Sequence, residues 1–195
     1  MSIDTSAIED LVTRVEARLP GGTARLIGFI ASAAGEGNST LSRAYASTSA
    51  ARPQRRVLLL ETGDGKGAGV MQALADDQPL DALVKRLPTG AFVVGLGSDA
   101  DGALWALVAR TDLWQALRER FDDIVVDLPS PAESRLGLAI APHCDGVVVV
   151  LEAEKTRVPV VSNLIASLQA VRANVLGTVL NKRRFHLPER VYRWL

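Results

Sequence analysis

A glycine-rich segment is the part of the sequence best suited to chemistry. It reads ASAAGEGNST over Ala31–Thr40, between an apolar run at Arg25–Ala31 and a stretch of helical pattern at Thr40–Ala51. A loop between a strand and a helix can hold a phosphate group, because backbone N–H groups and the positive end of the helix dipole point toward it. The segment therefore predicts a phosphate-binding loop.

This loop lacks the cation that such loops normally carry. The usual ending is Gly-Lys followed by Ser or Thr, whereas here Gly37 is followed by Asn38, Ser39 and Thr40. The lysine contacts the β- and γ-phosphates, and the hydroxyl helps to hold magnesium. Losing a charge-assisted contact costs roughly 1.5–3 kcal/mol of binding. We therefore expect weakened or lost binding of ATP and ADP with magnesium, and no fast phosphoryl transfer. The alternative is that Gly35 and Gly37 form only a tight turn.

Short β-branched or leucine-rich runs alternate with helical stretches along the chain. The expected strands are Arg25–Ala31, Arg56–Leu60, Ala91–Leu96, Ile124–Asp127, Gly146–Leu151 and Val175–Leu180. Helices are expected at Thr40–Ala51 and Leu104–Phe121, and an amphipathic N-terminal helix is expected from the spacing of Ile8, Leu11, Val12, Val15 and Leu19. This alternation predicts an α/β fold of three layers, in which helices cover both faces of a mainly parallel central sheet. Ligands of such sheets bind at the carboxyl ends of the strands.

Composition limits the domain organisation and the class of ligand. The length of 195 residues suits one domain, which we expect at residues 23–184 between an N-terminal helix at 1–22 and a basic-aromatic segment at 185–195. With 22 basic and 22 acidic residues, the net charge of +0 gives no reason to expect nucleic acid as a ligand. The polar first residues and the single cysteine, Cys144, predict a cytoplasmic protein.

The order of several segments resembles one family. The segments are ASAAGEGNST, RRVLLLETGDG, FDDIVVDLPSP, DGVVVVLEAEKT and GTVLNKRR, from about Arg25 to Arg184. Together they resemble the bacterial tyrosine kinases (BY-kinases) of capsule and exopolysaccharide synthesis, which are related to the partition and septum-placement ATPases. The resemblance implies the P-loop NTPase fold. It also marks Asn38 as the position of the family's lysine, so the Walker A motif is degenerate.

The resemblance also assigns roles to individual residues. The loop residues Gly35, Glu36, Gly37, Asn38, Ser39 and Thr40 match the nucleotide-binding motif, and Ser39 would hold magnesium together with Asp127 at the end of IVVDLPS. Glu61 matches the first acid of the family's second motif, so Asp127 and Glu61 are the candidate catalytic acids. Gly63 stands where the second acid belongs, and Asp64 lies one place late. Asn181, with Arg183 nearby, matches a position that faces adenine.

Three functions remain open at this point. The first is a catalytically degenerate kinase-like regulator or scaffold of exopolysaccharide or capsule synthesis and export. Its partner would be a membrane-embedded co-polymerase or export protein that recruits it to the inner face of the plasma membrane, with a homo-oligomer as a further option. The second is an active ATPase or tyrosine kinase, with a lysine such as Lys155 replacing the lost charge. The third is a partition-like positioning protein, which the neutral charge and the missing lysine disfavour.

Other residues carry a weaker signal. His143 and Cys144 are adjacent but lack further metal ligands at suitable spacing, so we expect a structural role for both. The family's tyrosine-rich tail is not evident, since Tyr192 is alone in HLPERVYRWL. We expect this basic-aromatic segment to bind a protein partner or to pack on its own domain.

Overall fold

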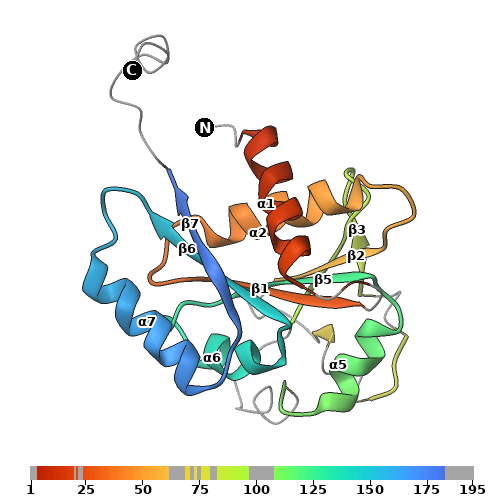
Figure 1. The fold of residues 1–195 in the computed structure, drawn as a ribbon. Helices are drawn as coiled ribbons and strands as arrows, with labels where there is room; N and C mark the ends of the chain where they lie inside the picture. The colour runs from red at the N-terminus through yellow and green to blue at the C-terminus, as the bar shows by residue number, and fades with distance from the viewer. Residues whose placement is uncertain are drawn as a thin grey trace.

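A seven-stranded sheet forms the centre of the molecule (Figure 1). The computed structural model describes residues 4–19, 21, 24–61, 69–70, 73, 76–79, 83–96 and 108–182. The strands lie in the order β3-β4-β2-β5-β1-β6-β7, and all neighbouring pairs are parallel except β3 with β4. Their bounds are β1 Arg25–Ala31, β2 Val57–Glu61, β3 Lys85–Arg86, β4 Phe92–Gly95, β5 Asp123–Leu128, β6 Gly146–Glu152 and β7 Val175–Asn181.

Helices cover both faces of this sheet, which gives three layers. Helices α1 (Thr5–Arg18) and α2 (Asn38–Ala50) lie on one face, and α5 (Thr111–Arg118), α6 (Leu136–Ile140) and α7 (Val158–Ala170) lie on the other (Figure 1). A short 3₁₀ helix at Ala141–His143 follows α6. The central strands β1 and β5 are buried along their whole length, because a parallel sheet between two helical layers has no solvent-facing side. The predicted α/β fold of three layers is therefore confirmed.

Most of the expected elements are present with small shifts at their ends. The N-terminal helix is confirmed as α1, and its buried residues Ile8, Val12 and Val15 pack into the same core cluster as Tyr45 of α2. Strand β3 and helices α6 and α7 were not expected. No helix among the described residues is both long enough and apolar enough to cross a bilayer.

The expectation of one helix over Leu104–Phe121 is wrong in its described part. Helix α5 begins only at Thr111, after Arg110 in an extended conformation. The indole N–H of Trp114 donates to the carbonyl oxygen of Val108 at 2.8 Å. In a continuous helix that carbonyl would accept from the backbone N–H four residues later, so the tryptophan takes the place of a helical bond. Residues 101–107 lie outside the described part of the chain.

A buried ion network ties α1 to the amino ends of the strands. Asp123, the first residue of β5, accepts hydrogen bonds from Arg25 Nε at 2.8 Å, Ser49 Oγ at 2.7 Å and Arg55 Nη1 at 3.0 Å. Glu16 of α1 forms ion pairs with Arg25 and Arg55, and also with Arg52. Because these charges lie at the end of the sheet opposite the glycine-rich loop, they hold the frame without contacting the candidate site.

Candidate functional site

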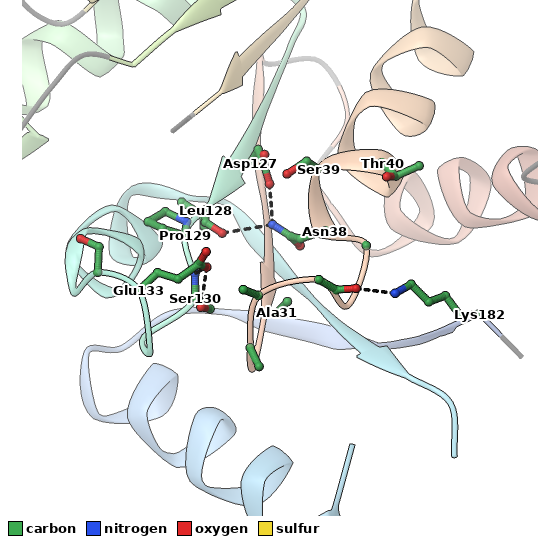
Figure 2. Close-up of a pocket in the computed structure, with 15 residues that line it drawn as sticks. Ala31, Asn38, Ser39, Thr40, Asp127, Leu128, Pro129, Ser130, Glu133 and Lys182 are labelled. Atoms are coloured by element: carbon green, nitrogen blue, oxygen red, sulfur yellow. Dashed lines mark hydrogen bonds between the residues drawn. The ribbon is translucent and has the colours of Figure 1, made fainter. Parts of the chain in front are cut away.

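The glycine-rich loop borders a cavity of about 560 Å³ at the carboxyl ends of β1 and β5 (Figure 2). Gly35 and Gly37 adopt φ values of 81° and 96°, which L residues rarely adopt, so the loop needs glycine at both positions. Gly37 is also the N-cap of α2, and no side chain caps the helix there. The N–H groups of the first turn therefore remain available to an anion.

Two segments supply the described lining of this cavity. The lining residues are Ala31, Ala33, Ala34, Gly35, Gly37, Asn38, Ser39, Thr40, Asp127, Leu128, Pro129, Ser130, Glu133, Ser134 and Lys182. All come from the loop and the start of α2 or from the end of β5 and the turn after it, except Lys182. The sequence-predicted residues Gly35, Gly37, Asn38, Ser39, Thr40 and Asp127 are thus brought together.

Asn38, at the lysine position, turns its side chain toward the sheet. Its Nδ2 donates to Asp127 Oδ1 at 2.6 Å and to the Leu128 carbonyl at 3.1 Å (Figure 2). The same nitrogen also lies 2.9 Å from the Phe29 carbonyl oxygen, as a further hydrogen bond. The Oδ1 of Asn38 is buried and has no hydrogen-bond partner among the described residues. The amide therefore serves the protein's own acceptors, and this position offers no positive charge to a phosphate.

Of the two candidate catalytic acids, Asp127 lines the cavity, whereas Glu61 does not belong to its described lining. Asp127 on β5 and Glu61 on β2 are direct neighbours in the register of the two strands. Burial raises the pKa of Asp127, although hydrogen bonds from Ser39 and Asn38 act in the opposite direction. Glu61 is paired with Arg43 of α2. Magnesium prefers such hard oxygen ligands, so Asp127 and the Ser39 hydroxyl fit a magnesium ion, and Asn38 is the residue that does not fit a bound nucleotide.

Glu36 and Asn181 fasten the loop instead of facing the cavity. The Glu36 carboxylate is buried and accepts from Ser32 N at 2.7 Å and Ala33 N at 3.2 Å, and it also accepts from the Thr156 hydroxyl. Asn181 Nδ2 donates to the Glu36 carbonyl at 2.9 Å. A Cβ atom on Gly37 would lie 2.1 Å from that same Asn181 nitrogen, so the packing is close. The predicted adenine contact of Asn181 stays a prediction.

Among the described residues, one lysine lies at the cavity, and it is not the one that the sequence suggested. Lys182 Nζ donates to the Gly35 carbonyl (Figure 2) and lies 3.3 Å from Glu152 Oε2. The Lys155 side chain is 70% exposed and pairs with Glu152 at 3.1 Å, and it does not belong to the described lining. Among the described residues, Lys182 is therefore the cation closest to the loop.

The sequence interpretation missed Glu133. Its Oε2 accepts from Ser130 Oγ at 2.6 Å, and both residues line the cavity. The spacing Ser130-Pro-Ala-Glu133 is that of a capping box, which could have indicated the contact. The described lining thus has two carboxylates, Asp127 and Glu133, against one ammonium group, Lys182. This balance disfavours a bare phosphate and makes a divalent cation important for any nucleotide binding.

Several predicted positions have no part in the described site. Arg183, Gly63, Asp64 and the segment 185–195 lie outside the described residues. Cys144 is buried, and burial raises the pKa of its thiol to about 12, which leaves no reactive thiolate at neutral pH. His143 stacks on Trp114 with ring centroids 5.5 Å apart. Within the described ranges no group of three or more His, Cys, Asp or Glu residues could hold a metal ion.

Comparison with known proteins gives both sequence and structural relatives. The chain is 29% identical over 183 residues to the succinoglycan biosynthesis transport protein ExoP of Rhizobium meliloti (strain 1021). This match covers 84% of the chain and 23% of ExoP, so the chain spans less than a quarter of that relative. No model of a known protein family matches the sequence.

Solved structures show the same fold at low sequence identity. The kinase domain of the Escherichia coli tyrosine kinase ETK superposes with a TM-score of 0.80 at 16% identity, covering 94% of this chain and 78% of that one. Cobyrinic acid a,c-diamide synthase from Mycobacterium smegmatis, with bound ATP analogue and magnesium, gives a TM-score of 0.62 at 21% identity over 85% of this chain and 82% of the other. The carboxyl end of the sheet, where the glycine-rich loop lies, is thus part of a shared fold.

Proposed function

We propose that the chain is a kinase-like regulator or scaffold of exopolysaccharide synthesis and export, because it is similar in sequence to ExoP and shares its fold with the kinase domain of a bacterial tyrosine kinase. Its relation to ExoP, a biosynthesis transport protein, supports the pathway. We propose a membrane-embedded co-polymerase or export protein as the partner, which would recruit the chain to the inner face of the plasma membrane.

The orientation of Asn38 carries the proposal that catalysis is lost. Phosphoryl transfer depends on charges placed around the transferred group, and removing one such contact costs a factor of about 100 to 1,000 in rate. Here the amide of Asn38 is hydrogen-bonded to Asp127 and two carbonyls, so it cannot approach a γ-phosphate without breaking three contacts. In this proposal the chain keeps the fold, whereas phosphoryl transfer at the cavity is weakened.

A phosphoryl-transfer assay tests this proposal. Incubation with magnesium and radiolabelled ATP should give no more ADP or phosphotyrosine than the Asp127→Asn variant gives. Both proteins should have the same circular dichroism, so that a folding defect does not imitate inactivity. Tyrosine phosphorylation or ATP hydrolysis by the natural protein that disappears in Asp127→Asn would show an active enzyme and contradict the proposal.

A second candidate function is a nucleotide sensor that binds without turnover. Lys182 supports it, because its ammonium group already contacts the loop carbonyl of Gly35 at the mouth of the cavity. The backbone N–H groups at the start of α2 remain uncapped by side chains. A phosphate bound there would have Lys182 as its nearest described cation, with magnesium on Ser39 and Asp127 supplying the remaining charge.

Replacement of Lys182 tests whether it serves as that cation. We expect Lys182→Met to weaken the binding of magnesium-ADP by about tenfold, since one charge-assisted contact is lost. The matched control is Lys155→Met, which removes a lysine paired to the same Glu152 but lying away from the cavity. Calorimetric titration of the three proteins measures the effect. Equal affinities for all three would remove Lys182 from the site.

A further inference from the structure

Helix α1 and strand β7 lie beside each other (Figure 1), and a groove of about 370 Å³ opens between them. Its lining comes from α1 between residues 11 and 18, from residues 176–179 of β7 and from Val148 of β6. We call it the α1–β7 groove. Its described lining shares no residue with that of the cavity at the glycine-rich loop. Its volume lies within the range of about 300–1,000 Å³ that is typical of sites for small molecules.

The walls of the α1–β7 groove are mainly aliphatic. The apolar side chains of its described lining are those of leucine, valine and alanine residues, and no aromatic ring is among them. A planar ligand gains from an aromatic side chain on which it can stack, whereas an aliphatic chain needs only apolar surface that removes it from water. The lining therefore suits an aliphatic body better than a nucleobase or another flat ring.

Two arginines give the groove a positive charge. Arg14 and Arg18 belong to its described lining, and no acid does. They stand four residues apart on α1, a spacing at which like charges on a helix repel each other. Among the described residues no acid forms an ion pair with either arginine, although Asp10 lies one turn before Arg14. An anion bound to both guanidinium groups would remove this repulsion.

Arg18 is already held at the groove. Its Nη1 donates to the carbonyl oxygen of Leu176 on β7. This contact uses one of the several N–H donors of the guanidinium group, so others remain for a ligand. Because the side chain is placed before any ligand arrives, less conformational freedom is lost on binding. The helix dipole accounts for a positive charge in the last turn of α1, where Arg18 lies, but Arg14 precedes that turn.

We propose that the α1–β7 groove binds a single-chain anionic amphiphile, with its carboxylate or phosphate head on Arg14 and Arg18 and its aliphatic tail along the apolar walls. Arginine suits both heads, because its planar fork forms two parallel hydrogen bonds to carboxylate or phosphate oxygens. The head supplies the negative charge that the described lining lacks. A cationic amphiphile with the same tail would meet two like charges. This inference does not depend on the proposed function.

Calorimetric titration of the whole chain tests the proposal. Laurate and dodecyl phosphate are the probes, used below the concentrations at which they form micelles, and we expect one saturable site for each. Dodecyltrimethylammonium should bind more weakly by about tenfold or more, because its head is cationic, and so should inorganic phosphate, because it has no tail. Arg14→Gln and Arg18→Gln should each lower the affinity for laurate by about tenfold, since each removes a charge-assisted contact.

Vesicles distinguish a membrane lipid from a free acyl anion as the source of this ligand. Co-sedimentation with phosphatidylglycerol vesicles but not with phosphatidylcholine vesicles, reduced in Arg14→Gln, would identify the membrane lipid. Saturable binding of laurate without co-sedimentation would identify the free anion. Either result supports the proposal, because both require the same head on the arginines and the same aliphatic tail.

The matched control is Arg157→Gln, which replaces an exposed arginine outside the described lining and should leave the affinity for laurate unchanged. Arg18→Gln also removes the contact with Leu176, so thermal melting must show that this variant is folded. Arg14→Gln keeps that contact and is decisive by itself. No saturable binding of either anion, equal binding of the cationic amphiphile, or an unchanged affinity in Arg14→Gln would overturn the proposal.

Discussion

Asn38→Lys should bind magnesium-ADP and magnesium-ATP about 10 to 100 times more tightly than the natural protein. The reason is that a lysine in this position contributes a charge-assisted hydrogen bond to the phosphates, worth roughly 1.5–3 kcal/mol. The loop needs no other repair, since Gly35 and Gly37 already have left-handed conformations and α2 already presents uncapped N–H groups. Calorimetric titration with each nucleotide, with and without magnesium, measures the gain.

The same substitution removes a cost from the fold. The buried Oδ1 of Asn38 has no partner among the described residues, and an unsatisfied buried acceptor costs about 1–3 kcal/mol. A lysine has no such acceptor, and its ammonium group would meet Asp127, where Asn38 now donates at 2.6 Å. We therefore expect the lysine variant to fold and to keep Asp127 paired in the absence of nucleotide.

Asn38→Met separates charge from shape. Methionine has nearly the length of lysine but no charge, so its affinity for nucleotide should not exceed that of the natural protein. If the methionine and lysine variants bound equally well, relief of the buried acceptor, not the charge, would explain the gain. If the natural protein already bound as tightly as the lysine variant, another residue would supply the cation, and Lys182 would be the first candidate.

The sheet was the most predictable part of the molecule. Strands such as Arg25–Ala31 are buried on both faces and carry continuous runs of apolar residues, so their positions follow from composition alone. Helix α7 was missed although its sequence is apolar, because its outer face lacks the charged residues that normally reveal an amphipathic helix.

Local motifs predicted which residues gather at the site, but not what their side chains do there. The loop, Ser39 and Asp127 meet at the cavity as expected, because the topology of a parallel sheet brings strand ends together. Glu36 turns away to bind its own loop, and Asn38 turns inward to Asp127. These orientations depend on contacts between residues up to 145 positions apart, such as Asn181 with Glu36, which spacing along the chain cannot reveal.

Asp123→Ala should cause the largest loss of stability of any single substitution discussed for this protein. The Asp123 side chain has no exposed surface, and it accepts from Arg25, Arg55 and Ser49. Removing one partner of a buried ion pair costs about 3–5 kcal/mol, since the other charge stays buried without compensation. For a chain of this length we expect Tm to fall by roughly 10 °C, as measured by thermal unfolding.

A surface ion pair gives the matched control for this loss. Asp112 pairs with Arg110 at 2.5 Å, but its side chain is 62% exposed, so Asp112→Ala should leave Tm nearly unchanged. A Tm for Asp123→Ala within two or three degrees of the natural protein would mean that water or Glu16 compensates Arg25, and that the network contributes little. A fall in Tm of roughly 10 °C would instead show that the ion network at the amino ends of the strands contributes much of the protein's stability. A frame held there would tolerate changes in the glycine-rich loop at the opposite end of the sheet.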